Sequence, residues 1–199
     1  MGEQLIVYNR QLEEAKLNDY LNKNVIYLDC EIDRDSSVWF CRQLSKLAER
    51  ELKKEEKDRK PIKVMINSYG GCVVDFFYIA STMLRYEEKG VVIETYCNGY
   101  AMSAGAYILM LGSKGHRYAT RFCNIVVHQT QLTLCSHYTQ ADLKQLNEDV
   151  EKNWDILVDL MKKYTDMSDK DIENLIDKNL DVTYHAKDAL EKGIIDIIL

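Results

Sequence analysis

The sequence has little of the residues that interrupt or cross-link a chain. Its 199 residues include one proline and nine glycines, and its six cysteines are scattered without CxxC or CxxxC spacing. None of the four histidines joins these cysteines at the spacing of a zinc site. In a chain of this length we therefore expect reduced, mostly buried thiols, no disulfide framework, no metal and no cofactor.

Long apolar runs and an excess of positive charge are also missing. The longest apolar stretch, residues 98–113, is interrupted or bounded by Asn98, Ser103 and Ser113, and it is shorter than the ~20 residues of a membrane helix. The N-terminal segment lacks the apolar core of a signal peptide, and the net charge of −6 disfavours a nucleic-acid-binding surface. We expect a cytoplasmic protein with neither a membrane nor a nucleic acid as partner.

What the chain does have is a regular alternation of strand and helix patterns. Hydrophobic residues make up 46% of it, which is enough for one substantial core. Such alternation predicts an α/β fold built from βαβ units with mostly parallel strands. We expect strands at 24–32, 62–68, 91–97, 116–120 and 123–129, a first helix capped by Asp35 or Ser36, and helices over 72–90 and from Ser103 onward.

The C-terminal third has a different pattern. Apolar residues recur at steps of three and four from Thr139 to Tyr164, which predicts one long amphipathic helix. A helix of that length spans ~37 Å, which exceeds a sheet of this size, so we expect it to project and to pack on another subunit. Two short helices, 168–178 and 185–192, and a last strand in "IIDIIL" follow.

Three positions at strand ends carry groups suited to acyl transfer. Ser103 follows the 91–97 strand and the expected turn at Gly99, although a plain helix-capping serine fits the same place. The "INSYGG" segment at 66–71 offers backbone N–H groups for an oxyanion, and His128 ends the "NIVVHQ" strand. In a parallel sheet these three places share one edge, which is the arrangement of nucleophile, base and oxyanion donors.

Four motifs give the chain a family resemblance. They are "INSYGG" at 66–71, "GYAMSAGAYILMLGSKGHRYA" at 99–119, "NIVVHQ" at 124–129 and "KDALEKGIID" at 187–196. In this order and spacing they resemble the ClpP family of serine peptidases. The resemblance implies a ClpP/crotonase-like superhelical ββα core in a single domain, 1–199. Its head would cover about 20–130 and 166–199, and a projecting "handle" helix would cover about 131–165.

The resemblance also implies roles for individual residues. Ser103 matches the nucleophile, His128 the general base, and Asp181 the aspartate that orients the histidine. The backbone N–H groups of Gly71 and Ala104 match the oxyanion hole. Without the resemblance, residue types alone do not separate Asp181 from its neighbours Asp177 and Asp188.

Family members cleave unfolded polypeptides inside a chamber of heptameric rings, single or stacked as a tetradecamer, which an AAA+ unfoldase feeds. This chain departs from the pattern: Tyr69 replaces a proline, Ala104 replaces a methionine, and the glycine-rich strand after His128 has no glycine. Lys63 and Asn98 stand where an apolar dock for the unfoldase is usual, beside Met65 and Tyr96. These departures favour a divergent member, phage-encoded or a specialised paralogue, with a different unfoldase or none.

Three alternatives compete with this interpretation. A crotonase-type acyl-CoA enzyme shares the core but needs no serine, so the Ser103, His128 and Asp181 set would be a coincidence. A non-catalytic ring subunit usually loses one member of the triad, and all three are present here. A viral head-maturation protease has the same chemistry with capsid and scaffold proteins as substrates.

Overall fold

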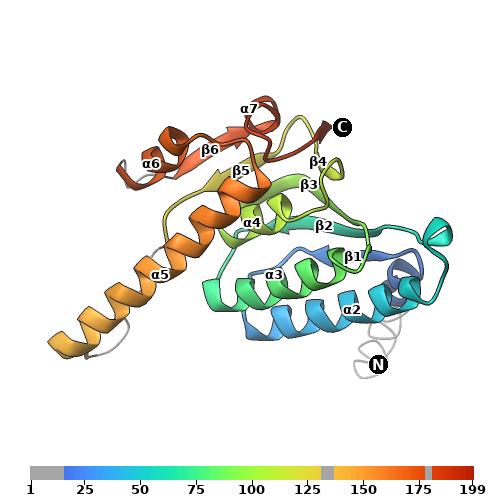
Figure 1. Ribbon diagram of the computed structural model, residues 1–199, viewed down its shortest axis with the longest axis horizontal. Helices are drawn as coiled ribbons and strands as arrows, with labels where there is room; N and C mark the ends of the chain where they lie inside the picture. Colours follow the sequence, from blue (N-terminus) through green and yellow to red (C-terminus); the bar gives the residue numbers. More distant parts are fainter. Residues whose placement is uncertain (1–15, 131–136, 178–180) are drawn as a thin grey trace, which may run out of the picture.

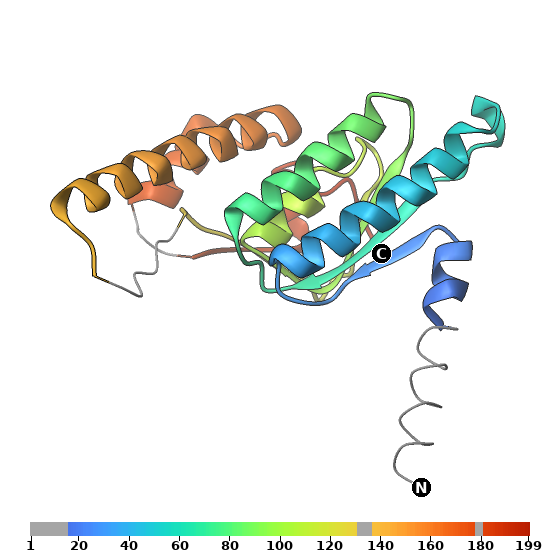
Figure 2. The ribbon, with the colours of Figure 1, turned by 90° about the horizontal axis from the view of Figure 1, so that it is seen from below.

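The computed structural model describes residues 16–130, 137–177 and 181–199. One mostly parallel sheet forms the centre of the molecule, and the pair α2 and α3 packs side by side along one face of it (Figures 1 and 2). A short helix over 16–22 precedes the sheet. The elements in chain order are β1 (Val25–Leu28), α2 (Arg34–Leu52), the 3-10 helix η1 (Glu56–Asp58), β2 (Ile62–Ser68), α3 (Val73–Glu87), β3 (Ile93–Met102), α4 (Ala104–Met110), β4 (Arg117–Ala119), β5 (Asn124–Val127), α5 (Gln140–Tyr164), α6 (Asp169–Asp177), β6 (Val182–His185), α7 (Ala186–Glu191) and β7 (Ile197–Ile198).

The sheet divides in two along β3. The first part of this ten-residue strand pairs with β4, which continues the order β1-β2-β3-β4-β7. Its last part, Tyr100–Met102, pairs instead with β5, and β5 pairs with β6. The pairing of β5 with β6 is antiparallel, whereas the other strand pairs of the described sheet are parallel. The α/β class with a mostly parallel sheet is thus as expected.

Local sequence explains most of the early elements. In β2 the side chains of Ile62, Val64 and Ile66 are buried, and the alternate positions are partly exposed, as one covered face requires. Helix α2 begins two or three residues earlier than expected because Asp33 is its cap. The Asp33 carboxylate accepts from the Ser36 N–H at 2.8 Å, and the Ser36 hydroxyl accepts in return from the Asp33 N–H.

The expectation for residues 98–113 was wrong in one respect. The strand does not end at Cys97 with a turn at Gly99; β3 continues to Met102, and only residues 104–110 are helical. Gly99 serves a close approach, because a Cβ there would lie 2.6 Å from Oδ1 of Asn67 on the neighbouring strand. The same Asn67 oxygen accepts a hydrogen bond from the Tyr100 N–H at 3.3 Å.

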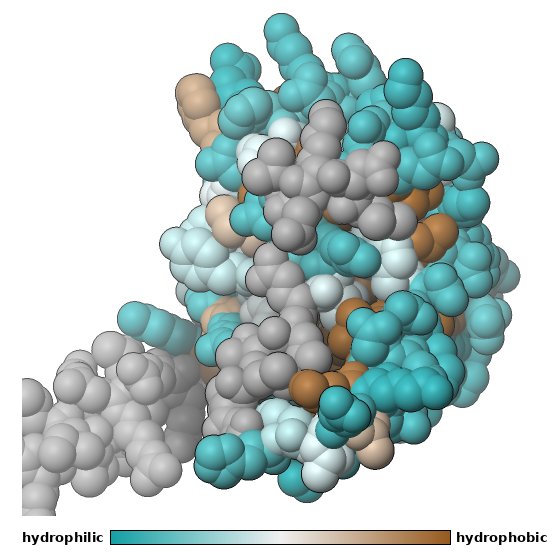
Figure 3. Space-filling view, turned by 90° about the vertical axis from the view of Figure 1, so that its left-hand side faces the viewer, coloured by the Kyte–Doolittle hydropathy of each residue, from teal (hydrophilic) through white to brown (hydrophobic). Residues whose placement is uncertain are grey.

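Helix α5 is buried only in its second half. Thr139 caps it, Trp154, Leu157 and Met161 are its buried side chains, and its first half extends away from the sheet (Figure 1). Seen from the side toward which α5 projects, the surface is mostly hydrophilic with scattered apolar patches (Figure 3). Leu143, on the projecting half, is 42% exposed.

A buried ion pair joins the last part of the chain to the sheet. Arg117 of β4 is almost fully buried, and its guanidinium donates two hydrogen bonds to Asp196, of 2.8 and 2.6 Å. The same guanidinium donates to the carbonyl of Tyr164, the last residue of α5. One arginine therefore holds β4, the end of α5 and the C-terminal segment together, and bidentate geometry compensates for the burial of its charge.

The described cysteines are free thiols. Cys41, Cys97 and Cys123 are buried, whereas Cys30 and Cys72 are exposed. Cys135 lies outside the described residues. No group of three or more histidines, cysteines or carboxylates in the described ranges is placed to hold a metal ion.

Candidate active site

Ser103 occupies a strained turn between β3 and α4. Its backbone angles are φ 52° and ψ −125°, which a residue other than glycine rarely adopts. The backbone is fixed on both sides: the Ser103 N–H donates to the Val126 carbonyl at 2.8 Å, and its carbonyl accepts from Ala106 at 2.9 Å. Such strain costs about 1–3 kcal/mol and persists where the surrounding structure enforces it, typically at functional sites.

The Ser103 hydroxyl does not cap α4. Ser103 stands at the N-cap position, but its side chain makes no capping hydrogen bond, and within the described residues its hydroxyl has no hydrogen-bond partner. A serine that merely begins a helix would use its oxygen to satisfy an N–H of the first turn. The strained backbone instead presents a free hydroxyl.

The "YGG" turn packs directly beneath this serine. Gly70 has φ 95°, and a Cβ there would lie 2.6 Å from the Met102 carbonyl oxygen and 2.7 Å from Ser103 Cβ. Ile32 fixes the turn: its N–H donates to the Gly70 carbonyl at 2.8 Å, and its carbonyl accepts from Cys72 at 2.7 Å. Only glycine allows the two strand ends to approach so closely.

Two backbone N–H groups next to Ser103 are unpaired. In the described part of the chain, neither the Gly71 N–H nor the Ala104 N–H donates to a protein acceptor. Ala104 is the first residue of α4 and buried, while Gly71 is exposed. Unpaired donors from a turn and from the first residue of a helix are the components of an oxyanion hole.

His128 follows directly after β5 and is partly buried. Its Nδ1 lies 2.6 Å from the carbonyl oxygen of Gln129. Because a carbonyl only accepts, this contact assigns the proton of a neutral ring to Nδ1 and leaves Nε2 as the acceptor. The histidine carbonyl is itself within 3.4 Å of the Tyr107 hydroxyl, a donor from α4.

A cavity of about 530 Å³ brings these groups together. Its inner wall is apolar, with Phe76 of α3, Tyr107 of α4 and Leu157 of α5. The complete lining is Tyr69, Gly71, Cys72, Val73, Phe76, Ser103, Ala104, Tyr107, His128, Thr130 and Leu157. The cavity therefore joins the expected serine, the expected histidine and both expected oxyanion positions, although no hydrogen bond links Ser103 to His128 in the described residues.

Asp181 directly precedes β6, the strand that pairs with β5, and it makes no hydrogen bond to the histidine within the described ranges. The β5–β6 register pairs Val127 with Val182, so one further step would place His128 opposite Asp181. Asp181 is exposed, and within the described ranges no hydrogen bond joins it to His128, whose Nδ1 faces Gln129 instead. Of the other two aspartates, Asp188 is an exposed residue of α7, and the side chain of Asp177 is outside the described set.

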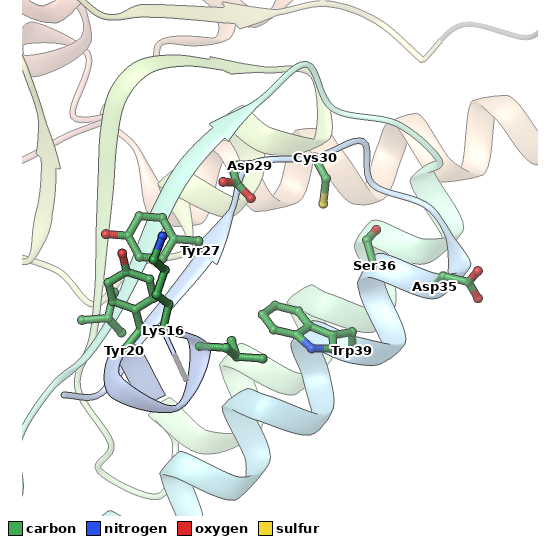
Figure 4. A pocket seen from close by; sticks show the side chains of 10 residues that line it. Lys16, Tyr20, Tyr27, Asp29, Cys30, Asp35, Ser36 and Trp39 are labelled. Carbon is green, nitrogen blue, oxygen red and sulfur yellow. The ribbon is translucent and has the colours of Figure 1, made fainter. Parts of the chain in front are cut away.

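A larger hollow lies elsewhere and has different chemistry. It measures about 910 Å³ and lies between the 16–22 helix, β1 and α2 (Figure 4). Among the described residues, its lining includes Tyr20, Tyr27 and Trp39, together with one thiol, Cys30, but no histidine. Partial burial and the neighbouring Asp29 raise the pKa of that thiol, so it stays protonated and is a poor nucleophile. Size therefore does not identify the reactive site.

A protein-family model described as Clp protease matches residues 10–199. The chain belongs to the Clp protease family. Members are ClpP-like serine peptidases that act on polypeptides and generally assemble into oligomeric rings. The matched range contains all the residues that line the cavity with Ser103 and His128, and the mostly parallel α/β sheet agrees with the ClpP fold. None of the helices in the described ranges is long and apolar enough to cross a membrane.

Sequence reasoning missed two contributors to this candidate site. Gly70 was considered only as half of a glycine pair, yet it is the residue that contacts Ser103. Leu157 comes from the long helix, which the sequence assigned to assembly alone, and it forms part of the cavity wall. The adjacent glycines were a usable signal for the first, whereas nothing local distinguishes Leu157 from the other apolar residues of α5.

Proposed function

We propose that this protein is a serine endopeptidase that cleaves unfolded polypeptides through a Ser103, His128 and Asp181 acyl-enzyme mechanism. The observation that carries the proposal is the strained Ser103, whose hydroxyl does not cap α4. It lines one cavity with His128 and two unpaired N–H groups. A core serine would need neither the strain nor the free donors. A crotonase-type reaction would need the donors but not the hydroxyl.

The first step is attack of Ser103 Oγ on the scissile carbonyl carbon. His128 Nε2, which carries no proton in the tautomer that the Gln129 contact favours, accepts the hydroxyl proton. The new C–O bond pushes the carbonyl electrons onto oxygen, and the Gly71 and Ala104 N–H groups donate to that oxyanion. The imidazolium then gives its proton to the leaving amine, and water hydrolyses the acyl-enzyme by the same steps.

Asp181 would act on His128 and not on the substrate. We assign it the carboxylate that accepts from Nδ1–H, holds the tautomer and stabilises the imidazolium. This requires His128 to exchange the Gln129 carbonyl for Asp181, its neighbour in the continued strand register. The exchange is a local change at the ends of β5 and β6, and ring assembly is the event that would favour it.

Assembly would place the site inside a chamber. The first half of α5 has apolar side chains, including the 42% exposed Leu143, that find no burial within the single chain. We assign this half to the contact between rings, with a heptamer or a double-ring tetradecamer as the assembly. A cytoplasmic AAA+ unfoldase is the partner we propose for delivery of substrates.

A fluorophosphonate tests the nucleophile independently of substrate preference. We expect the parent protein to gain one adduct by intact mass, located on Ser103 by peptide mapping, and Ser103→Ala to gain none. Ser45→Ala is the matched control, because Ser45 lines a different hollow between α2 and α3. An adduct that persists in Ser103→Ala would contradict the proposal and assign the reactive nucleophile to another residue. No adduct on a folded, assembled parent would also contradict it and would favour the non-catalytic ring subunit.

A further inference from the structure

An exposed aromatic pair stands at the rim of the candidate active site. Tyr69, in the turn after β2, is 69% exposed and also lines the cavity that holds Ser103 and His128. Its ring stacks on that of Tyr100, with centroids 4.3 Å apart and planes inclined by 27°. One face of the Tyr69 ring therefore packs on Tyr100, and the other face is exposed to solvent.

The backbone of the supporting residue is fixed by its neighbouring strands. Tyr100 belongs to β3, its N–H donates to Asn67, and its strand position pairs with Asn124 of β5. A tyrosine is neutral at physiological pH, and desolvation, Tyr69 and Asp29 raise the pKa of the Tyr100 hydroxyl further. The stack is therefore an uncharged aromatic surface whose supporting residue belongs to a paired strand.

The backbone fixes the distance from this surface to the reaction. Tyr69 immediately precedes Gly70, whose Cα hydrogens lie against Ser103, and Gly71 supplies one of the unpaired donors. A polypeptide whose carbonyl lies at Ser103 must therefore pass within a few residues of the Tyr69 ring. The buried wall of Phe76, Tyr107 and Leu157 is a separate part of the same cavity.

We propose that Tyr69, supported by Tyr100, forms a substrate subsite that selects an aromatic side chain close to the scissile bond. The inference rests on the proposed peptidase function and adds a residue that decides which polypeptides are cut. Aromatic rings gain from offset stacking beyond the burial of their area, and Tyr100 has already restricted the conformational freedom that binding would otherwise cost.

The test uses internally quenched peptides in which a single phenylalanine is moved through each position around one cleavage site in an alanine-based sequence. At one position we expect phenylalanine to raise kcat/KM about three- to tenfold over alanine. Tyr69→Ala should reduce that preference to less than about twofold, Tyr100→Ala should reduce it in part, and Tyr69→Phe should keep it. Tyr78→Ala is the matched control, because Tyr78 is an exposed tyrosine on α3 that lines a different hollow.

Fluorophosphonate labelling of Ser103, measured on every variant, separates the two proposals. Equal labelling with a lost preference in Tyr69→Ala supports the subsite. Equal labelling with an unchanged preference overturns the subsite and leaves the peptidase function standing. A second set of these peptides has arginine in place of phenylalanine. A preference for arginine over phenylalanine overturns the aromatic assignment, because the rings would then be binding a cation. Failure to cleave any peptide removes the peptidase function, and the subsite with it.

Discussion

Replacement of Gly70 by alanine tests whether contact between the two strand ends positions the nucleophile. Gly70 has φ 95°, and the new Cβ would meet the Met102 carbonyl oxygen at 2.6 Å, Ser103 Cβ at 2.7 Å and the Ala104 nitrogen at 3.0 Å. These neighbours are backbone or a short side chain in a strained turn, so they cannot rotate away. The left-handed backbone alone costs about 1–2 kcal/mol, and a forced backbone shift adds about 1–3 kcal/mol.

Gly115 provides the control for the backbone part of that cost. Its φ is 85°, close to that of Gly70, but a Cβ there would meet nothing within 4 Å. We expect Gly115→Ala to lower the free energy of unfolding by about 1–2 kcal/mol and Gly70→Ala by about 2–5 kcal/mol. Urea unfolding measures both.

Reactivity should separate the two variants further than stability does. A displacement of Ser103 by about 1 Å is enough to slow its reaction with a fluorophosphonate about 100-fold, because attack depends on alignment with the base and the oxyanion donors. Gly115→Ala should label within about twofold of the parent. Equal losses of stability and of labelling rate in the two variants would refute the role given to the close contact.

Two further predictions concern stability and assembly. Glu51 is buried, which alone would raise its pKa, but hydrogen bonds from Lys54 and the Lys60 N–H outweigh burial and lower the pKa to about 2. The contribution of Glu51 to the free energy of unfolding is therefore complete above its ordinary pKa of 4.5 and lost as the pH falls toward 2. We expect Glu51→Gln to be less stable than the parent by up to about 3 kcal/mol at neutral pH, and this difference should shrink in urea unfolding at low pH. A gap independent of pH would contradict this. Leu143→Glu should change the unfolding free energy by less than about 0.5 kcal/mol, yet weaken assembly as measured by sedimentation velocity. Leu190 is equally exposed, and Leu190→Glu should leave assembly intact. The same effect of both variants on assembly would count against the α5 contact.

Elements defined by their own periodicity could be predicted from the sequence. The alternation of Ile62, Val64 and Ile66 defines β2, and steps of three and four define α5. The end of β3 could not be predicted, because a glycine in sequence can indicate either a turn or a strand position that a neighbouring side chain approaches closely. Gly99 is of the second kind. The side chain in question, Asn67, is more than thirty residues away in sequence. The four-residue strand β6 was missed because it has no period of its own and exists through its pairing with β5.

The candidate site shows the same division. That Ser103, His128 and the glycine turn share one cavity follows from the rule that parallel strands end at a common edge. The relation of Asp181 to His128 does not follow from any such rule, since it depends on the register of an antiparallel pair. The strain at Ser103 is likewise invisible in sequence, because it arises from hydrogen bonds to Val126 and to α4.

Helix α5 is anchored only near its C-terminal end, so a small tilt of the helix moves its N-terminal end much further than its anchored end. Its inner end is held by the burial of Trp154, Leu157 and Met161 and by the bond from Arg117 to the Tyr164 carbonyl. Its outer half has no buried side chain among the residues that the structure describes. A tilt of about 5° around Leu157 would carry Gln140, ~25 Å away, through about 2 Å. Leu157, at the centre of this rotation, would barely move. In the proposed assembly, the fit between copies at the outer end could therefore change while the cavity beside Ser103 keeps its dimensions.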